Sequence, residues 1–162
     1  MSQIRGIEML LLLFSVGRDS YAIESSRVVE VIPSVPLRKL HHVPQYVAGL
    51  LNYRGTIAPV VDLSHLIQGV SSRFQLSTRI MIVKSSEETA MPYLGLLAEQ
   101  VIQTLDKSKA EFVNSKTVHM NAAPYLGGMI LDERGMIQQI HVDRLFADVQ
   151  QIYFAAREAQ LQ

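Results

Sequence analysis

Cysteine is absent from the 162 residues, so the chain contains no disulfide, no thiolate nucleophile and no cysteine-ligated metal site. Its absence makes a cytosolic location the simpler expectation. An excess of one charge is also missing, because 15 basic residues balance 15 acidic ones. The chain therefore has no global field to attract nucleic acid or an anionic membrane. Hydrophobic residues make up 48% of it, which indicates a globular protein of one domain or two small ones.

Long apolar runs are lacking too. The longest unbroken one, Met9–Phe14, falls far short of the ~20 residues that a membrane-spanning helix requires. A signal peptide is the alternative for this end of the chain, but the segment has only Arg5 before the run and no clear small-x-small cleavage site. We interpret the run as a buried first strand and predict no direct membrane insertion.

Motifs for catalysis or cofactor binding are missing as well. Neither a G-x-x-x-x-G-K-[ST] loop nor a G-x-G-x-x-G loop occurs. His41 and His42 are adjacent and point apart, and the other histidines lack a carboxylate at ligand spacing. Asp62, Ser64 and His65 supply the letters of a hydrolytic triad, but they fall within one helix start, whereas triad members converge from separate elements. We predict no catalytic residue, no metal, no cofactor and no enzymatic activity, and we interpret the basic cluster at 38–42 as a solvated loop.

Turn residues and β-branched density predict an all-β chain. The expected strands lie at 11–16, 21–24, 25–32, 50–61 (a hairpin), 78–84, 93–97 and 101–105, with a last hairpin around 132–135 after a long connection at 106–124. The two serines that begin 25–32 leave a short helical turn open as an alternative there. Pro44 is expected to begin a short helix that Gly49 ends, and Asp62 to cap another over 63–67. Apolar residues between 145 and 156 predict a closing amphipathic helix of about 14 residues.

The sequence repeats itself loosely. The pattern of Tyr21–Ile23 and Val28–Glu30 recurs at an offset of 73 residues, and Pro44–Leu51 recurs at an offset of 79 as Ala123–Ile130. Two matches in the same order indicate two similar β units. Because a unit as short as these offsets imply has a thin core, we expect the two units to share an apolar interface.

The stretch Asn52-Tyr53-Arg54-Gly55 interrupts two apolar runs. Asn at the first position and Gly at the fourth predict a type I turn followed by a left-handed glycine bulge. Backbone geometry then explains Asn52 and Gly55 and leaves the side chains of Tyr53 and Arg54 free. Arginine and tyrosine are enriched at protein–protein hot spots, so these two side chains are candidate contacts with a partner.

Several stretches together resemble the CheW-type chemotaxis coupling proteins over about residues 9–147: Val28–Ile32, Val43-Pro44, Gly49–Leu63, Thr78–Val83 and Gly95–Val101. The resemblance implies two SH3-like five-stranded β-barrel subdomains around a shared hydrophobic core, with short helices and a C-terminal amphipathic helix. On this interpretation 20–77 form mostly the first barrel, 78–142 mostly the second with strands exchanged between them, and 148–162 a helical tail.

The resemblance also implies a function. Such proteins are non-enzymatic cytoplasmic adaptors at receptor arrays beneath the inner membrane. They join the cytoplasmic tips of methyl-accepting receptors to the regulatory domain of a CheA-type histidine kinase. The motif's arginine and acidic residue fall on Arg54 and Glu30, beside Asn52 and Tyr53 in the turn. A groove for the receptor tip is expected near Val28, Val31 and Ile32, with a second wall near Leu97 and Val101.

Three departures from the family pattern keep other interpretations open. Tyr53 stands where leucine is commoner, Gln138-Gln139 interrupts a usually apolar strand, and Glu99 replaces the more frequent aspartate. They leave room for a CheW-like adaptor of a non-flagellar pathway, such as pilus motility or surface sensing. A stand-alone SH3-like binding module and an enzyme with an unrecognised site are the remaining alternatives.

Overall fold

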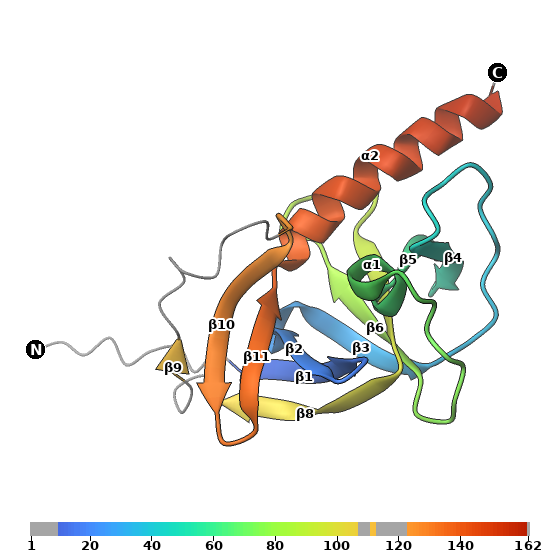
Figure 1. Cartoon of the computed structure of the whole chain (residues 1–162). Coiled ribbons are helices and arrows are strands. Elements are labelled where there is room, and N and C mark those ends of the chain that lie inside the picture. Colours follow the sequence, from blue (N-terminus) through green and yellow to red (C-terminus); the bar gives the residue numbers. More distant parts are fainter. Residues whose placement is uncertain (1–9, 107–110, 113–122, 162) are drawn as a thin grey trace, which may run out of the picture.

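The computed structural model describes residues 10–106, 111–112 and 123–161 (Figure 1). In chain order the elements are β1 (Leu10–Val16), β2 (Asp19–Glu24), the 3-10 turn η1 (Ser25–Arg27), β3 (Val28–Pro33), β4 (Val47–Tyr53), β5 (Thr56–Asp62), α1 (Leu63–Gln68), β6 (Arg79–Lys84), β7 (Tyr93–Ala98), β8 (Gln100–Asp106), β9 (Glu111–Phe112), β10 (Leu126–Asp132), β11 (Gly135–Ile140) and α2 (Val142–Leu161). The predicted strands are confirmed. Both features considered for 25–32 occur, since η1 precedes β3. Most of the expected connection at 106–124 lies outside the described residues.

The strands form two sheets, and the first and last strands along the chain belong to the same one (Figure 1). The five-stranded sheet has the order β3-β6-β7-β5-β4, and the six-stranded sheet has the order β8-β1-β2-β11-β10-β9. The boundary expected near residue 77 falls between β5 and β6, which belong to the same sheet. The prediction of an all-β fold with two subdomains is confirmed.

The internal repeat is confirmed by backbone pairing. In the five-stranded sheet β5 runs parallel to β7, with Val60 opposite Gly95. In the other sheet β11 runs parallel to β2, with Gln139 opposite Ala22, which are the positions that the two offsets predict. The turn before each matching hairpin also repeats: the N–H of Val47 donates to Pro44 O, and that of Leu126 to Ala123 O, both at 3.0 Å. The chain therefore contains two copies of one unit, and each sheet combines strands from both.

The five-stranded sheet curls until its two edges meet. The segment after β3 returns to β4, where Arg38 N donates to Leu50 O at 3.0 Å and Leu50 N donates to Arg38 O at 2.7 Å. A Cβ at Gly49 would lie 2.7 Å from Arg38 O, so glycine permits this close approach. The predicted helix from Pro44 to Gly49 is wrong, because Pro44 precedes a single turn and Gly49 lies inside β4. Gly49 serves the contact between the sheet edges and ends no helix.

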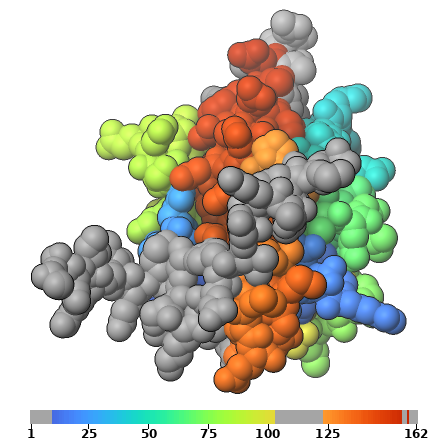
Figure 2. Space-filling model, turned by 60° about the vertical axis from the view of Figure 1, so that its left-hand side comes forward, coloured from blue at the N-terminus to red at the C-terminus, as the bar shows by residue number. Residues whose placement is uncertain are grey.

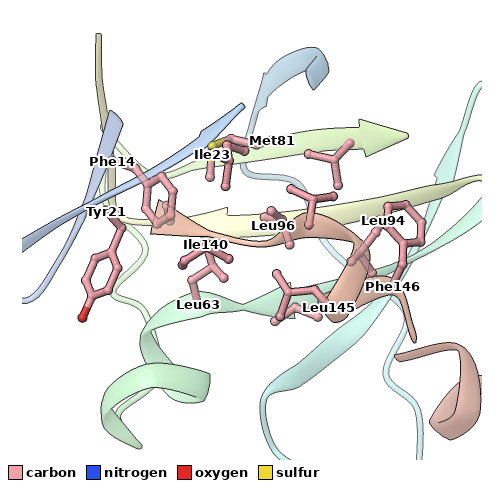
Figure 3. Close-up of a cluster of buried hydrophobic side chains, with 14 of the residues drawn as sticks. Phe14, Tyr21, Ile23, Leu63, Met81, Leu94, Leu96, Ile140, Leu145 and Phe146 are labelled. Atoms are coloured by element: carbon pink, nitrogen blue, oxygen red, sulfur yellow. The ribbon is translucent and has the colours of Figure 1, made fainter. Parts of the chain in front are cut away.

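A shared hydrophobic core lies between the two sheets (Figure 3). Phe14 and Ile23 enter it from the six-stranded sheet, Met81 and Leu96 from the five-stranded sheet, and Phe146 from α2. Each sheet also has a small cluster of its own on its other face. The shared core explains how two units of this size hold together, since each unit alone would bury little apolar surface.

The helices follow the predicted signals with one difference in length. The Asp62 carboxylate accepts hydrogen bonds from the N–H groups of Ser64 at 3.1 Å and His65 at 3.4 Å, as predicted for a cap, and the left-handed Gly69 ends α1. The closing helix α2 has 20 residues and begins at Val142, so it is longer than predicted. In the part of the chain that the structure describes, neither helix is long and apolar enough to cross a membrane.

Candidate functional site

The hairpin between β4 and β5 differs from the predicted turn type. Tyr53 pairs with Thr56, so only Arg54 and Gly55 form the loop, and both have positive φ, 50° and 85°. This is the pattern of a type I′ turn, whose twist matches the right-handed twist of the strands, and not of a type I turn with a bulge. The Asn52 carboxamide oxygen accepts a hydrogen bond from Gly55 N at 2.9 Å. The turn therefore holds Arg54 in a left-handed backbone conformation.

We expect the change Gly55→Val to destabilise the fold by about 1–3 kcal/mol, the cost of a backbone held in a disfavoured region. A Cβ at this position would meet no atom within 4 Å, so the penalty comes from the positive φ and not from a clash. Chemical denaturation measures it, with Gly55→Asn as the matched control, because asparagine tolerates left-handed geometry. Equal midpoints for the valine variant and the wild type would contradict the type I′ assignment.

A cluster of three side chains forms beside this turn. The Tyr53 hydroxyl donates a hydrogen bond to Glu30 Oε1 at 2.7 Å, and Arg54 Nη2 donates to the same oxygen at 2.8 Å. The guanidinium carbon of Arg54 lies 5.1 Å from the centroid of the Tyr53 ring, within the range of a cation–π contact. We call Glu30, Tyr53 and Arg54 the Glu30 cluster.

The curled sheet brings the cluster together. β3 carries Glu30 and β4 carries Tyr53, and these strands are the two ends of the sheet order. Tyr53 is only 6% exposed and packs edge-on against Tyr93, with the ring centroids 5.2 Å apart. By contrast, the Arg54 side chain is 71% exposed and that of Glu30 is 39% exposed. A buried tyrosine thus positions a carboxylate whose arginine partner remains accessible.

The hydrogen bond to Glu30 is the main cause that raises the pKa of Tyr53 above its ordinary value of 10.0, with burial adding to it. A raised pKa in the folded state gives stability that is present below pH 10 and is lost as the pH rises above it. We expect Glu30→Ala to move the pKa of Tyr53 back toward 10. An NMR titration of ¹³C-labelled tyrosine, assigned with Tyr53→Phe, measures the shift. An unchanged Tyr53 pKa in Glu30→Ala would show that the hydrogen bond is not its cause.

The other predicted site residues lie in three different environments. Val31 is 39% exposed and lies on the outer face of β3 with Val29, while Val28 and Ile32 face the other way and pack partly against the cores. Val101, on β8, is half-buried against the shared core. Leu97 is 1% exposed and packs inside the five-stranded sheet, so it presents no surface to a partner.

A model of the CheW-like domain matches residues 10–150. The chain belongs to the CheW-like family. Among curated CheW-like relatives, the chemotaxis protein CheW of Rhizobium meliloti (strain 1021) is 25% identical over 137 residues, which cover 84% of this chain and 86% of that protein. The chemotaxis protein CheW of Helicobacter pylori is 24% identical over 88 residues, which cover 54% of this chain and 53% of that protein, about half its length.

The fold of a CheW-like structure agrees as well. The crystal structure of the scaffolding protein TtCheW from Thermoanaerobacter tengcongensis is similar with a TM-score of 0.71 at 24% identity, covering 86% of this chain and 93% of that one. This likeness concerns the fold, and with the family match it confirms the resemblance inferred from the motifs.

Two features of the CheW-like surface were not predicted. Val29 is as exposed as Val31 and extends the apolar outer face of β3, which the alternation along the strand could have indicated. A groove of about 450 Å³ lies where the segment 34–39 meets Phe74, which is largely exposed. No cluster of side chains that could hold a metal ion occurs among the described residues.

Proposed function

We propose that this CheW-like protein is a non-enzymatic adaptor that joins the cytoplasmic tips of methyl-accepting receptors to the regulatory domain of a CheA-type histidine kinase. Its place would be the cytoplasm, at receptor arrays beneath the inner membrane. The Glu30 cluster is the observation that carries the proposal, because Glu30 and Arg54 are the two positions that the family motif associates with partner binding and they bond to each other.

The cluster suits recognition of a charged partner. A guanidinium has five N–H donors, and the hydrogen bond to Glu30 uses only one nitrogen of Arg54. The exposed remainder of the group is available to a carboxylate or a carbonyl of the partner. Because Tyr53 and Arg54 hold Glu30 in place, little side-chain freedom is lost on binding, and a preordered site gains affinity in this way.

The outer face of β3 provides the apolar part of the surface. β3 is the edge strand of its sheet, and its exposed Val29 and Val31 lie on either side of Glu30 in the sequence. An amphipathic helix of a receptor tip recognises such a surface through apolar residues at helical spacing. The receptor is therefore assigned to β3, and the kinase to the surface around the Arg54 turn.

The change Val31→Asp is expected to leave the fold intact, because Val31 is exposed, and to weaken binding of the receptor tip. A carboxylate placed in an apolar contact loses its hydration without gaining a partner. Met136→Asp is the matched control, since Met136 is an exposed apolar residue on β11 of the other sheet. Circular dichroism and a receptor pull-down give the result: full receptor binding by a folded Val31→Asp protein would remove Val31 from the contact.

Separate titrations with each partner test the proposal. Binding to both an isolated receptor tip and an isolated kinase regulatory domain supports an adaptor. Binding to neither favours the stand-alone SH3-like module.

Tyr53 favours a divergent pathway, such as pilus motility or surface sensing, because the leucine that is commoner at this position has no hydroxyl to donate to Glu30. Titration with kinases from both kinds of pathway distinguishes these outputs.

A further inference from the structure

A polar pocket of about 410 Å³ lies where α2 begins, away from the Glu30 cluster and next to β11. Figure 2 looks onto this side of the molecule, with β10 and β11 in orange below the red α2. Gln139 and His141 line the pocket, together with Asp143 and Arg144 of the first turn of α2 and with Glu24 and Arg27. It has no part in the function proposed above.

The internal repeat shows what is unusual about this pocket. Positions 139 and 141 correspond to Val60 and Asp62 of the first copy, at the offset of 79. In that copy Val60 is buried among apolar side chains and Asp62 caps α1. In the second copy these two positions carry the carboxamide of Gln139 and the imidazole of His141. The pocket therefore lies where the first copy has an apolar side chain and a capping carboxylate.

Within the described residues, no side chain caps the first turn of α2. Leu145 N donates to His141 O at 3.3 Å, but no side chain among the described residues accepts a hydrogen bond from the N–H groups of Val142, Asp143 or Arg144. The carboxylate of Asp143, in this first turn, bonds instead to Arg27 Nη2 at 2.7 Å and to Ser86 Oγ at 3.0 Å. Unbonded N–H groups at the start of a helix favour a negatively charged acceptor.

Gln139 gives a second and independent sign of a ligand. The residue is 7% exposed, it lines the pocket, and its carboxamide makes no hydrogen bond within the described part of the chain. Among the described residues every enclosed side-chain nitrogen and oxygen has a partner, so the unbonded carboxamide of Gln139 reaches the space of the pocket, where it is open to a ligand. Arg144, on the same pocket wall, is exposed and also makes no ion pair with described residues, whereas the charges of Arg27 and Asp143 compensate each other. Glu24 is the remaining acidic group that faces the pocket.

We propose that this pocket binds a small oxyanion group, a carboxylate or a phosphate, which completes the N-terminus of α2. The anion accepts hydrogen bonds from the first-turn N–H groups of α2 and from the Gln139 amide, and it pairs with the Arg144 guanidinium. It takes the place that the Asp62 carboxylate has at α1.

NMR titration of the ¹⁵N-labelled full chain with inorganic phosphate and, separately, with acetate tests the proposal at constant ionic strength. We expect saturable shifts of the 142–144 amides and of the Gln139 side-chain amide, with a Kd of about 1–10 mM for ligands of so few atoms. The tighter of the two anions identifies the source of the oxyanion. Gln139→Val, which restores the residue of the first copy, and Arg144→Gln should each weaken binding ~5-fold or more.

Arg18→Gln, at an exposed turn outside the pocket, is the control and should bind as the wild type does. If Gln139→Val fails to fold, the exposed Arg144→Gln carries the test. Shifts that do not saturate with either anion would overturn the proposal, as would an affinity that Arg144→Gln leaves unchanged.

Discussion

Arg54→Ala is expected to fold normally and to lose about 2–5 kcal/mol of binding free energy toward the kinase regulatory domain, the loss seen when one partner of a hydrogen-bonded charge pair that a complex buries is removed. In the free protein Arg54 is exposed, so the ion pair with Glu30 contributes little to stability. If Arg54 stayed exposed at the rim of the interface, its replacement by alanine would cost less than about 1 kcal/mol of binding free energy. Isothermal titration of the folded variant distinguishes an arginine that the complex buries from one that stays at the rim.

Two further substitutions separate the turn from the side chain. Arg54→Asn should be at least as stable as the wild type, because asparagine tolerates the left-handed φ of 50° at this position, and should still lose binding. Arg54→Lys keeps the charge but not the planar fork, so it should restore binding only in part. Affinities of Arg54→Asn within about a factor of two of wild type would make Arg54 ordinary hairpin surface.

Phe14→Ala is expected to destabilise the whole protein by about 3–5 kcal/mol, the usual cost of removing a buried aromatic ring. Phe14 is completely buried in the shared core, where it contacts Tyr21 in the stacked geometry (Figure 3). Because both sheets pack on this core, they should unfold in one transition at a lower temperature. Calorimetry measures this, with the almost fully exposed Leu76→Ala as a control that should leave the melting temperature unchanged.

Two separate transitions in Phe14→Ala, one of them near the wild-type melting temperature, would contradict this account of the core. They would mean that one sheet is stable without the other, although each has only a small cluster of buried residues to itself.

Local signals in the sequence were sufficient for most elements. Asp62 followed by an apolar turn predicted α1 and its cap, because a capping carboxylate acts within a few residues. The repeat at offsets of 73 and 79 predicted two similar units, and the paired parallel strands confirm it. The motif that contains Glu30 and Arg54 was sufficient to identify the family.

Features that depend on the curled sheet could not be predicted from local sequence signals. The pattern around Pro44 and Gly49 is typical of a short helix. Glycine is instead needed at position 49 because the backbone of Arg38 pairs closely with β4 there, and local sequence does not encode this contact. The turn at Arg54 is type I′ because it must match the twist of its strands. The bond from Tyr53 to Glu30 joins opposite edges of the sheet, so it follows only from the closed fold.

A bridging assay tests most directly whether this CheW-like chain connects a receptor to a kinase, as we propose. A receptor tip fragment is immobilised, and the CheA-type kinase is added with the wild-type protein, with Arg54→Asn or with no adaptor. We expect the kinase to be retained when the wild-type protein is present, to be largely lost with Arg54→Asn, and not to be retained without an adaptor. Equal kinase retention with and without the wild-type protein would contradict it.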